Sequence, residues 1–176
     1  MWGKRGCTLT TRDFETLQQM FEEHRDRNEA MTMLLRHKLE TARVTRPEVT
    51  PDDVVTLNSR ISFRVGNGMP ETRIICRDRS RGPLGYFLPI TTIRGLALLG
   101  LTEGQMTPVS RGRSLVEILQ VTAIHYQPER AARIRDLDAA KGSRFRVSEG
   151  GNQAETGLHQ KSLKRPDGDD PGPNAA

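Results

Sequence analysis

The segment Asp53–Phe63, with the sequence DVVTLNSRISF, decides how the middle of this chain is interpreted. Apolar and polar side chains alternate from this segment through Val65, and a period of two is typical of a β-strand with one buried face. The turn sequence GNG follows at 66–68, and RIICR at 73–77 predicts a second strand. The side chains expected on the buried face of the first strand are Val55, Leu57, Ile61, Phe63 and Val65.

Two more strands are predicted further along the chain. Residues 86–90 follow a loop at 80–85, and residues 115–126 form a long run rich in Leu, Val and Ile after a turn at 111–113. Only one of the connections is long enough to hold a crossover helix. We therefore expect a mainly antiparallel sheet, because parallel neighbours need long crossover connections.

A short helix is expected between these last two strands. Thr91 or Thr92 can cap its first turn, because a threonine hydroxyl accepts hydrogen bonds from the first free N–H groups of a helix. The helix should run through Leu99. Gly100 follows at the position where a left-handed residue commonly closes a helix.

Two helices are predicted before the first strand. Apolar residues recur there at helical spacing in two runs, separated by the polar sequence HRDRN at 24–28, which predicts an antiparallel hairpin. Pro47 and Pro51 end the helical region. The hairpin is either a cover for the sheet or a short projecting arm. The apolar runs are Phe14, Leu17 and Phe21, then Met31, Leu35, Leu39 and Ala42.

The order of these elements predicts an α+β protein in four parts. We expect a basic extension at 1–10, a short coiled-coil helical hairpin at 11–46 and a sheet domain at 50–130. From 141 to 176, Gly, Pro, Asp, Asn and Lys dominate. Such a tail buries too little surface to offset the entropy of ordering, so it is predicted to be disordered.

Charge and cysteine content narrow the class of protein. The net charge is +5, but residues 1–12 hold three bases and no acid, and residues 13–140 are nearly neutral. This argues against a dedicated nucleic-acid binder, whose folded domain is usually basic, and leaves a direct DNA contact open. Two cysteines without CxxC spacing suit a reducing compartment. No apolar run reaches membrane-spanning length and the start lacks a signal-peptide core, so we expect a cytoplasmic protein without membrane contact.

The sequence predicts no catalytic, metal or cofactor site. The histidines at 24, 37, 125 and 159 lack the spacing of a local metal site, and His125 near a strand end is interpreted as structural. There is no nucleophile elbow and no Walker sequence. The arginines at 73, 77, 79 and 81 form either a solvated hairpin edge or an electrostatic contact with an acidic partner or nucleic acid.

Three stretches together resemble a known family. DVVTLNSRISF at 53–63, LALLGL at 96–101 and IHYQPE at 124–129 occur in the order seen in the regulators of nucleoside diphosphate kinase, called Rnk. This family shares its C-terminal domain with the Gre transcript-cleavage factors, and the resemblance covers roughly residues 11–130. It implies a short helical hairpin followed by an FKBP-like curved antiparallel sheet with a short helix.

Single positions follow the Gre pattern or depart from it. Asn58 replaces a glycine in the first strand, and Asn tolerates the left-handed bend that glycine would allow. In the second motif Thr92 stands for serine and Ile93 for proline, in the loop with which Gre factors grip RNA polymerase. The matching positions are Val55, Ser59, Ile61, Gly95, Ala97, Leu98, Leu99 and Gly100.

The resemblance implies a transcription regulator that binds bacterial RNA polymerase at its secondary channel and competes there with Gre factors. We expect it to act as a monomer without a cofactor. Ile93 is expected to be an exposed anchor in this contact. The residues carried over as polymerase-binding are Thr91, Thr92, Ile93, Arg94 and Gly95.

Gre factors hold a metal ion with acidic residues at the tip of a long arm and cleave RNA with it. Helices of about 13 residues span only about 20 Å, and basic neighbours weaken the field of the tip acids, so we predict no cleavage and no enzyme activity. The alternatives are an adaptor that alters the level or activity of nucleoside diphosphate kinase, and a weak enzyme, either a vestigial cleavage factor or an isomerase. The acids near the predicted tip are Glu22, Glu23, Asp26 and Glu29.

Overall fold

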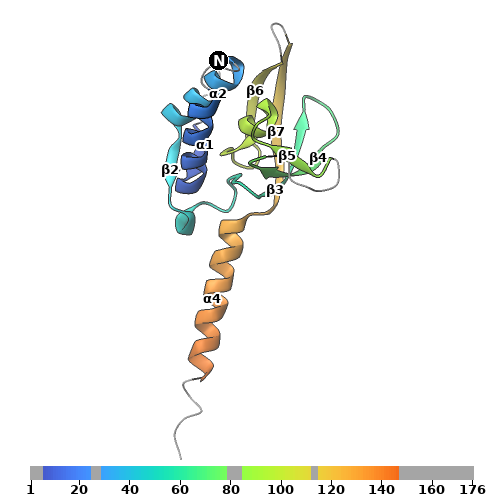
Figure 1. Ribbon diagram of the computed structural model, residues 1–176. Coiled ribbons are helices and arrows are strands. Elements are labelled where there is room, and N and C mark those ends of the chain that lie inside the picture. The colour runs from blue at the N-terminus through green and yellow to red at the C-terminus, as the bar shows by residue number, and fades with distance from the viewer. Residues whose placement is uncertain (1–5, 25–28, 79–84, 112–114, 147–176) are drawn as a thin grey trace, which may run out of the picture.

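The computed structural model describes residues 6–24, 29–78, 85–111 and 115–146. An N-terminal helical hairpin lies on one side of a five-stranded sheet, and a last helix projects away from both (Figure 1). The expected α+β class, a hairpin before a curved sheet with a short helix, is confirmed. Within the described part of the chain, no helix is long and apolar enough to cross a membrane.

The sheet has the strand order β5-β4-β3-β7-β6. Its ladders β3–β4, β3–β7 and β6–β7 are antiparallel, and β5 runs parallel to β4, so the mainly antiparallel arrangement is confirmed. Register shifts between β3 and β7 are irregularities of the kind that bend a strand. The strands are β3 (Arg60–Val65), β4 (Glu71–Cys76), β5 (Phe87–Pro89), β6 (Met106–Arg111) and β7 (Leu115–Tyr126).

The start of the first predicted strand needs correction. The alternation was expected to form a strand from Val55, but β3 begins only at Arg60. Asn58 has a φ of +65°, and this left-handed residue turns the chain before the strand begins. The hydroxyl of Ser59 accepts the backbone N–H of Thr56 at 3.1 Å and closes the turn. The bend expected at Asn58 is therefore confirmed, while the alternation before it belongs to a turn.

Strand β6 was not predicted from the sequence. Pro108 lies in the middle of β6, and the strand contains too many polar residues to show an apolar–polar alternation in the sequence. In the structure, Thr107 and Val109 lie on the buried side. β6 is an edge strand of the sheet, where a proline is tolerated because one side of the strand needs no ladder hydrogen bonds.

The hairpin consists of α1 (Thr11–His24) and α2 (Glu29–Thr41). At its root, β1 (Thr8–Thr10) pairs in parallel with β2 (Arg43–Thr45). Leu9 in β1 is fully buried. Residues 8–10 therefore belong to the folded body, which corrects the expectation that they lie in a basic extension.

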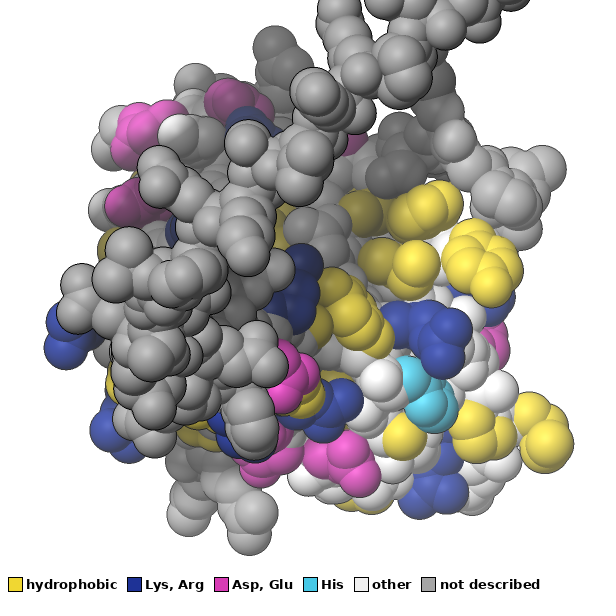
Figure 2. Space-filling view, turned by 90° about the horizontal axis from the view of Figure 1, so that it is seen from below, with side chains coloured by type: hydrophobic (Ala, Val, Ile, Leu, Met, Phe, Trp, Pro, Cys, Tyr) yellow, Lys and Arg dark blue, Asp and Glu magenta, His cyan; other side chains and the backbone are white. Residues whose placement is uncertain are grey.

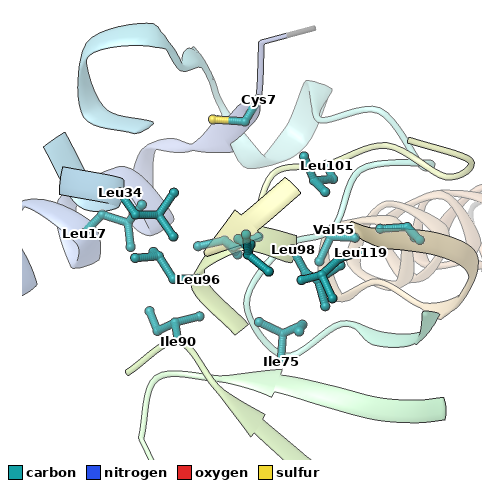
Figure 3. Close-up of a cluster of buried hydrophobic side chains, with 14 of the residues drawn as sticks. Cys7, Leu17, Leu34, Val55, Ile75, Ile90, Leu96, Leu98, Leu101 and Leu119 are labelled. Carbon is teal, nitrogen blue, oxygen red and sulfur yellow. The ribbon is translucent and has the colours of Figure 1, made fainter. Parts of the chain in front are cut away.

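The short helix α3 (Ile93–Leu98) lies between the hairpin and the sheet. Leu17 and Leu34 of the hairpin lie on one side of Leu96, and Leu98 is on the side of Ile75 and Leu119 from the sheet (Figure 3). One apolar core thus joins both parts. The hairpin covers α3 rather than the sheet itself.

The last helix, α4 (Pro128–Arg146), was not predicted and extends into the tail that we expected to be disordered from 141. Its base is fixed to the segment after the hairpin, which contains the 3-10 turn η1 (Pro47–Val49). Arg133 donates hydrogen bonds to the carbonyl of Pro47 and to the carboxylate of Asp52. Beyond this base the described side chains of α4 are exposed. The remaining tail lies outside the described residues.

Candidate functional site

The loop that precedes α3 is held by its own hydrogen bonds. Thr92 caps the helix: its hydroxyl accepts the N–H of Gly95 at 3.1 Å and donates to the carbonyl of Pro89 at 2.6 Å. A Cβ on Gly95 would lie 2.1 Å from that carbonyl oxygen, so only glycine fits this position. The predicted cap is confirmed. Gly100, with a φ of +80°, takes the left-handed conformation expected after the helix.

Ile93 does not have the exposure that we expected. Its side chain is half-buried and packs against the apolar core, whereas Thr91 and Thr92 are exposed. As the first residue of α3, Ile93 is directed toward the same core as Leu96. Its packing there stabilises the loop on the side that faces the core. The outer surface of the loop therefore consists of two threonines and the partly exposed Arg94.

Arg94 is fixed by a bidentate ion pair with Glu117 of β7. Its Nε lies 2.8 Å from Glu117 Oε2 and its Nη2 lies 2.9 Å from Oε1. The hydrogen bonds that the guanidinium donates to Glu117 raise the pKa of Arg94 above its ordinary value. Paired donors of this kind give the contact a defined orientation. Sequence reasoning missed Glu117, because no local pattern links it to a residue 23 positions away.

Buried Lys38 fastens the hairpin to the other end of α3. Its ammonium group donates to the carbonyl of Leu99 at 2.6 Å, where a positive charge complements the negative end of the helix dipole. Burial lowers the pKa of Lys38. A lysine in a helical pattern is usually exposed, so its sequence gives no sign of this role.

The acids near the hairpin tip are not gathered into one site. Glu22 and Glu23 are exposed in the last turn of α1, and Glu23 Oε1 lies 3.9 Å from Arg77 Nη2, just after β4. Asp26 lies outside the described residues, and Glu29 begins α2. Among the described residues, no group of three or more His, Cys, Asp or Glu could hold a metal ion.

The arginines that follow the first strand have different surroundings. Arg73 pairs with Glu71 at 2.7 Å, and Arg77 lies between Glu23 and Asp78, each at 3.9 Å. These partly exposed pairs are typical of a solvated hairpin edge. The arginines at 79 and 81 lie outside the described residues.

A polar cluster joins α1 to the base of α4, and sequence reasoning missed it. The hydroxyl of Thr56 donates to Glu129 at 2.6 Å and lies 2.9 Å from the hydroxyl of Ser59. Asp13, in the first turn of α1, is 2% exposed. Burial raises its pKa to about 6; a hydrogen bond from Thr10 opposes this rise and the charge of Glu129 adds to it. Gln127, completely buried, donates to the carbonyls of Pro51 and Val54 at 2.8 and 2.7 Å.

Comparisons with known proteins agree with this architecture. The chain is 33% identical over 98 residues to the "Regulator of nucleoside diphosphate kinase" of Escherichia coli strain K12, which covers 55% of this chain and 72% of the relative. The protein of the same name from Shigella flexneri gives the same values. The solved structure of "Prokaryotic transcription elongation factor GreA/GreB from Nitrosomonas europaea" has a TM-score of 0.52 and 26% identity, covering 70% of this chain and all of that one. No family model matches the chain.

These findings define the class as a regulator of the Gre/Rnk type, with a fold shared with transcription elongation factors. Within that class, the chain belongs to the family of regulators of nucleoside diphosphate kinase. The resemblance found in the sequence is thereby confirmed. The relatives above are named as regulators and as a transcription factor, not as catalysts.

Proposed function

We propose that this protein regulates transcription by binding bacterial RNA polymerase at the entrance of its secondary channel, through the loop Thr91–Gly95. The observation that carries the proposal is the rigidity of this loop at the surface. The Thr92 cap, the glycine at 95 and the Arg94–Glu117 pair fix its shape before any partner arrives. A preformed loop loses little conformational freedom on binding.

The structure changes the role that we assign to each residue in this contact. Because Ile93 packs against the core, it supports the loop and does not form the anchor. The direct contacts are assigned to Thr91, Thr92 and the exposed edge of Arg94. Gly95 shapes the backbone. The likeness to a GreA/GreB factor supports polymerase as the partner, with Gre factors as competitors.

The protein is proposed to act without cleaving RNA. Helix α1 has 14 residues and spans about 21 Å. Its last turn lies beside Arg77 at the end of β4, so the acidic side chain of Glu23 faces a basic residue of the body. The hairpin would enter the channel only partly and would exclude longer factors by occupying their binding surface.

Competition on purified core polymerase tests the proposal. The protein should displace a labelled Gre factor, and Thr91→Glu should weaken this displacement about tenfold, as expected when an exposed contact residue acquires an unfavourable charge. Ser110→Glu, on the exposed edge of β6, is the matched control and should displace like the wild type. Ile93→Asp is unsuitable, because it would disturb the core. Absence of displacement, or equal effects of both variants, would contradict the proposal.

A second candidate is an adaptor that changes the activity or level of nucleoside diphosphate kinase. The name of the relatives at 33% identity favours it. Purified kinase assayed with and without this protein separates direct action from an indirect one. If the kinase responds and polymerase does not bind, the adaptor function replaces the polymerase contact.

A further inference from the structure

The sheet has one face that the hairpin and α3 leave uncovered. In β3, Ile61 and Phe63 point inward and are buried, so the alternation turns Arg60, Ser62 and Arg64 outward. We call this the outer face and define it by these three residues and their neighbours across the strands. On the side seen in Figure 2, basic and hydrophobic side chains lie next to each other around a histidine.

The first row of the outer face combines two aromatic rings with an arginine. Arg60 is opposite Tyr126 on one side and Ile74 on the other, and Ile74 is opposite Phe87. The Cβ atoms of residues directly opposite each other in neighbouring antiparallel strands lie about 5 Å apart. Tyr126 is 46% exposed, and Arg60 is exposed without an ion-pair partner in the described part of the chain. An aromatic surface and a free guanidinium are thus side by side.

The middle of the outer face is polar. The Oγ of Ser62 lies 2.7 Å from Nε2 of His125 and 2.8 Å from Oγ1 of Thr72, so three groups that both donate and accept hydrogen bonds form a chain. In the next row, Nε of Arg64 donates to Oε1 of Gln120 at 2.7 Å. Ala123 lies opposite Ser62, and larger apolar side chains lie toward the far end, where Met106, Pro108 and Ile118 line an open hollow of about 570 Å³ beside Arg64.

This arrangement is the reverse of a protein-binding surface. Protein interfaces place apolar residues at the centre and polar residues at the rim. Here hydrogen-bonding groups occupy the centre, and aromatic and basic side chains lie beside them. Aromatic rings that stack on bases, with arginines for phosphates and polar groups for base edges, are the composition of sheet surfaces that hold single-stranded RNA.

The local charge also suits a polyanion, although the body as a whole is nearly neutral. Among the described strand positions directed to the outer face, none is Asp or Glu, whereas Arg60 and Arg64 are basic. Glu117 points to the other side, where Arg94 binds it. Asp53 and Glu103 border a second hollow beside Arg64 and Gln120. Phosphates are therefore expected near Arg60 rather than at that border.

We propose that the outer face binds single-stranded RNA. Bases stack on Tyr126 and Phe87, and a phosphate pairs with Arg60. The exposed side chains of Thr72 and His125 bind base edges and the 2′-hydroxyl, which only RNA presents, and the buried hydroxyl of Ser62 orients both of them. The contact does not use the loop Thr91–Gly95, so its outcome is independent of the polymerase contact.

Fluorescence anisotropy with a labelled, unstructured RNA of about twelve nucleotides tests the proposal on the full chain. Tyr126→Ala should weaken binding about tenfold, as for the loss of one stacked base, while Tyr126→Phe should retain it. Arg60→Ala should weaken binding about fivefold and reduce the slope of log Kd against log salt by about one. Arg135→Ala, an exposed arginine on α4, is the matched control and should bind like the wild type.

Amide chemical-shift mapping with the same RNA gives a second readout that needs no variant. Shifts should concentrate at Arg60, Ser62, Thr72 and Tyr126. Three results would each overturn the proposal: no saturable binding at low salt, equal losses in Arg60→Ala and Arg135→Ala, or shifts confined to the hairpin or α4. Equal affinity for DNA of the same sequence would overturn the assignment to RNA. Binding of an acidic helical peptide by this face, without RNA binding, would identify it as a protein-docking surface instead.

Discussion

The N-terminal hairpin and α4 are both helical, but they are held in opposite ways. In the hairpin, the side chains of Leu17 and Leu34 enter the common core and are almost completely buried. In α4, Ile134 and Leu137 are 52% and 61% exposed, and the contacts that hold the helix within the described part of the chain are polar and lie at its base. Burial therefore determines where the hairpin lies, whereas hydrogen bonds to one loop determine where α4 begins.

This difference shows which interaction holds each region: apolar burial holds the hairpin, and hydrogen bonds hold the base of α4. Apolar burial contributes to stability in proportion to the area removed from water, so the hairpin should unfold together with the sheet. A helix that touches the body only at its base contributes little burial and should fray independently. Variants that change one region at a time separate the two cases.

The largest effect is expected from Leu34→Ala in the hairpin. Leu34 is 1% exposed, and its truncation leaves a cavity between α1, α2 and α3, so the free energy of unfolding should fall by about 2–5 kcal/mol. Urea unfolding followed by circular dichroism measures it. Met33→Ala, on the same helix and 59% exposed, is the control and should change stability by less than about 0.5 kcal/mol. Similar losses in both variants would show that the hairpin is not part of the core.

The next effect depends on pH and arises at Asp13 in the first turn of α1, which is influenced by the charge of Glu129 at the base of α4. Burial gives Asp13 a pKa of about 6 in the folded state, above the ordinary value of 3.8 for an aspartate. The folded state therefore binds a proton more tightly than the unfolded state, and stability from this group increases as pH falls through about 6. The difference should reach about 2–3 kcal/mol between pH 7.5 and pH 4.

Urea unfolding of the wild type and of Asp13→Asn at several pH values measures this effect. The other titrating groups are common to both proteins, so the difference between them reports Asp13. The wild type should gain stability relative to the variant as pH falls toward 4. A difference that is constant with pH, or that changes in the opposite direction, would show that Asp13 is charged and well solvated in the folded state.

A smaller effect is expected at the base of α4. Gln127→Ala removes the amide that donates to the buried carbonyl of Val54 and to the part-buried carbonyl of Pro51, and should cost about 1–3 kcal/mol. Thermal unfolding measures the loss. Gln18→Ala, on the exposed side of α1, is the matched control. If Gln127→Ala is as stable as the control, the polar base does not hold α4 to the body.

The smallest effect is expected from Leu137→Ala on the projecting part of α4. Because the side chain is exposed and alanine is a strong helix former, stability should change by less than about 0.5 kcal/mol. Differential scanning calorimetry at two protein concentrations tests this. A loss above about 1 kcal/mol that grows with concentration would mean that α4 packs against another copy of the chain.

Rules that use only neighbouring residues correctly predicted the elements whose structure depends on those neighbours. The last strand has the bounds Leu115–Tyr126 that its run of apolar residues indicated, and Thr92 and Gly100 take the expected roles at the two ends of α3. Asn58 adopts the left-handed bend because few other residues tolerate it. These features need no distant partner.

The missed features depend on contacts between distant residues or on weak patterns. The Arg94–Glu117 pair, the Lys38–Leu99 bond and the Asp13 cluster join segments that nothing in the sequence links. Helix α4 lacks an apolar stripe, which is the pattern that reveals amphipathic helices. Pro128 at its first position and the alanine- and arginine-rich sequence after it were the available signals. Ile93 was placed outside because its neighbours are polar, but the helix turns it inward.

The parallel pairing of β1 with β2 has a consequence for how this protein can evolve. The chain enters and leaves the hairpin at the same place, because residues 8–10 pair with residues 43–45. This pairing does not depend on the length of the hairpin. The length of the hairpin can therefore vary without rebuilding the root. We expect that lengthening α1 and α2 together by seven residues each would leave the melting of the body unchanged while changing how far the protein reaches into a partner. Paired insertions in the two helices would thus let selection change the reach of the hairpin while the β1–β2 pairing at its root stays the same.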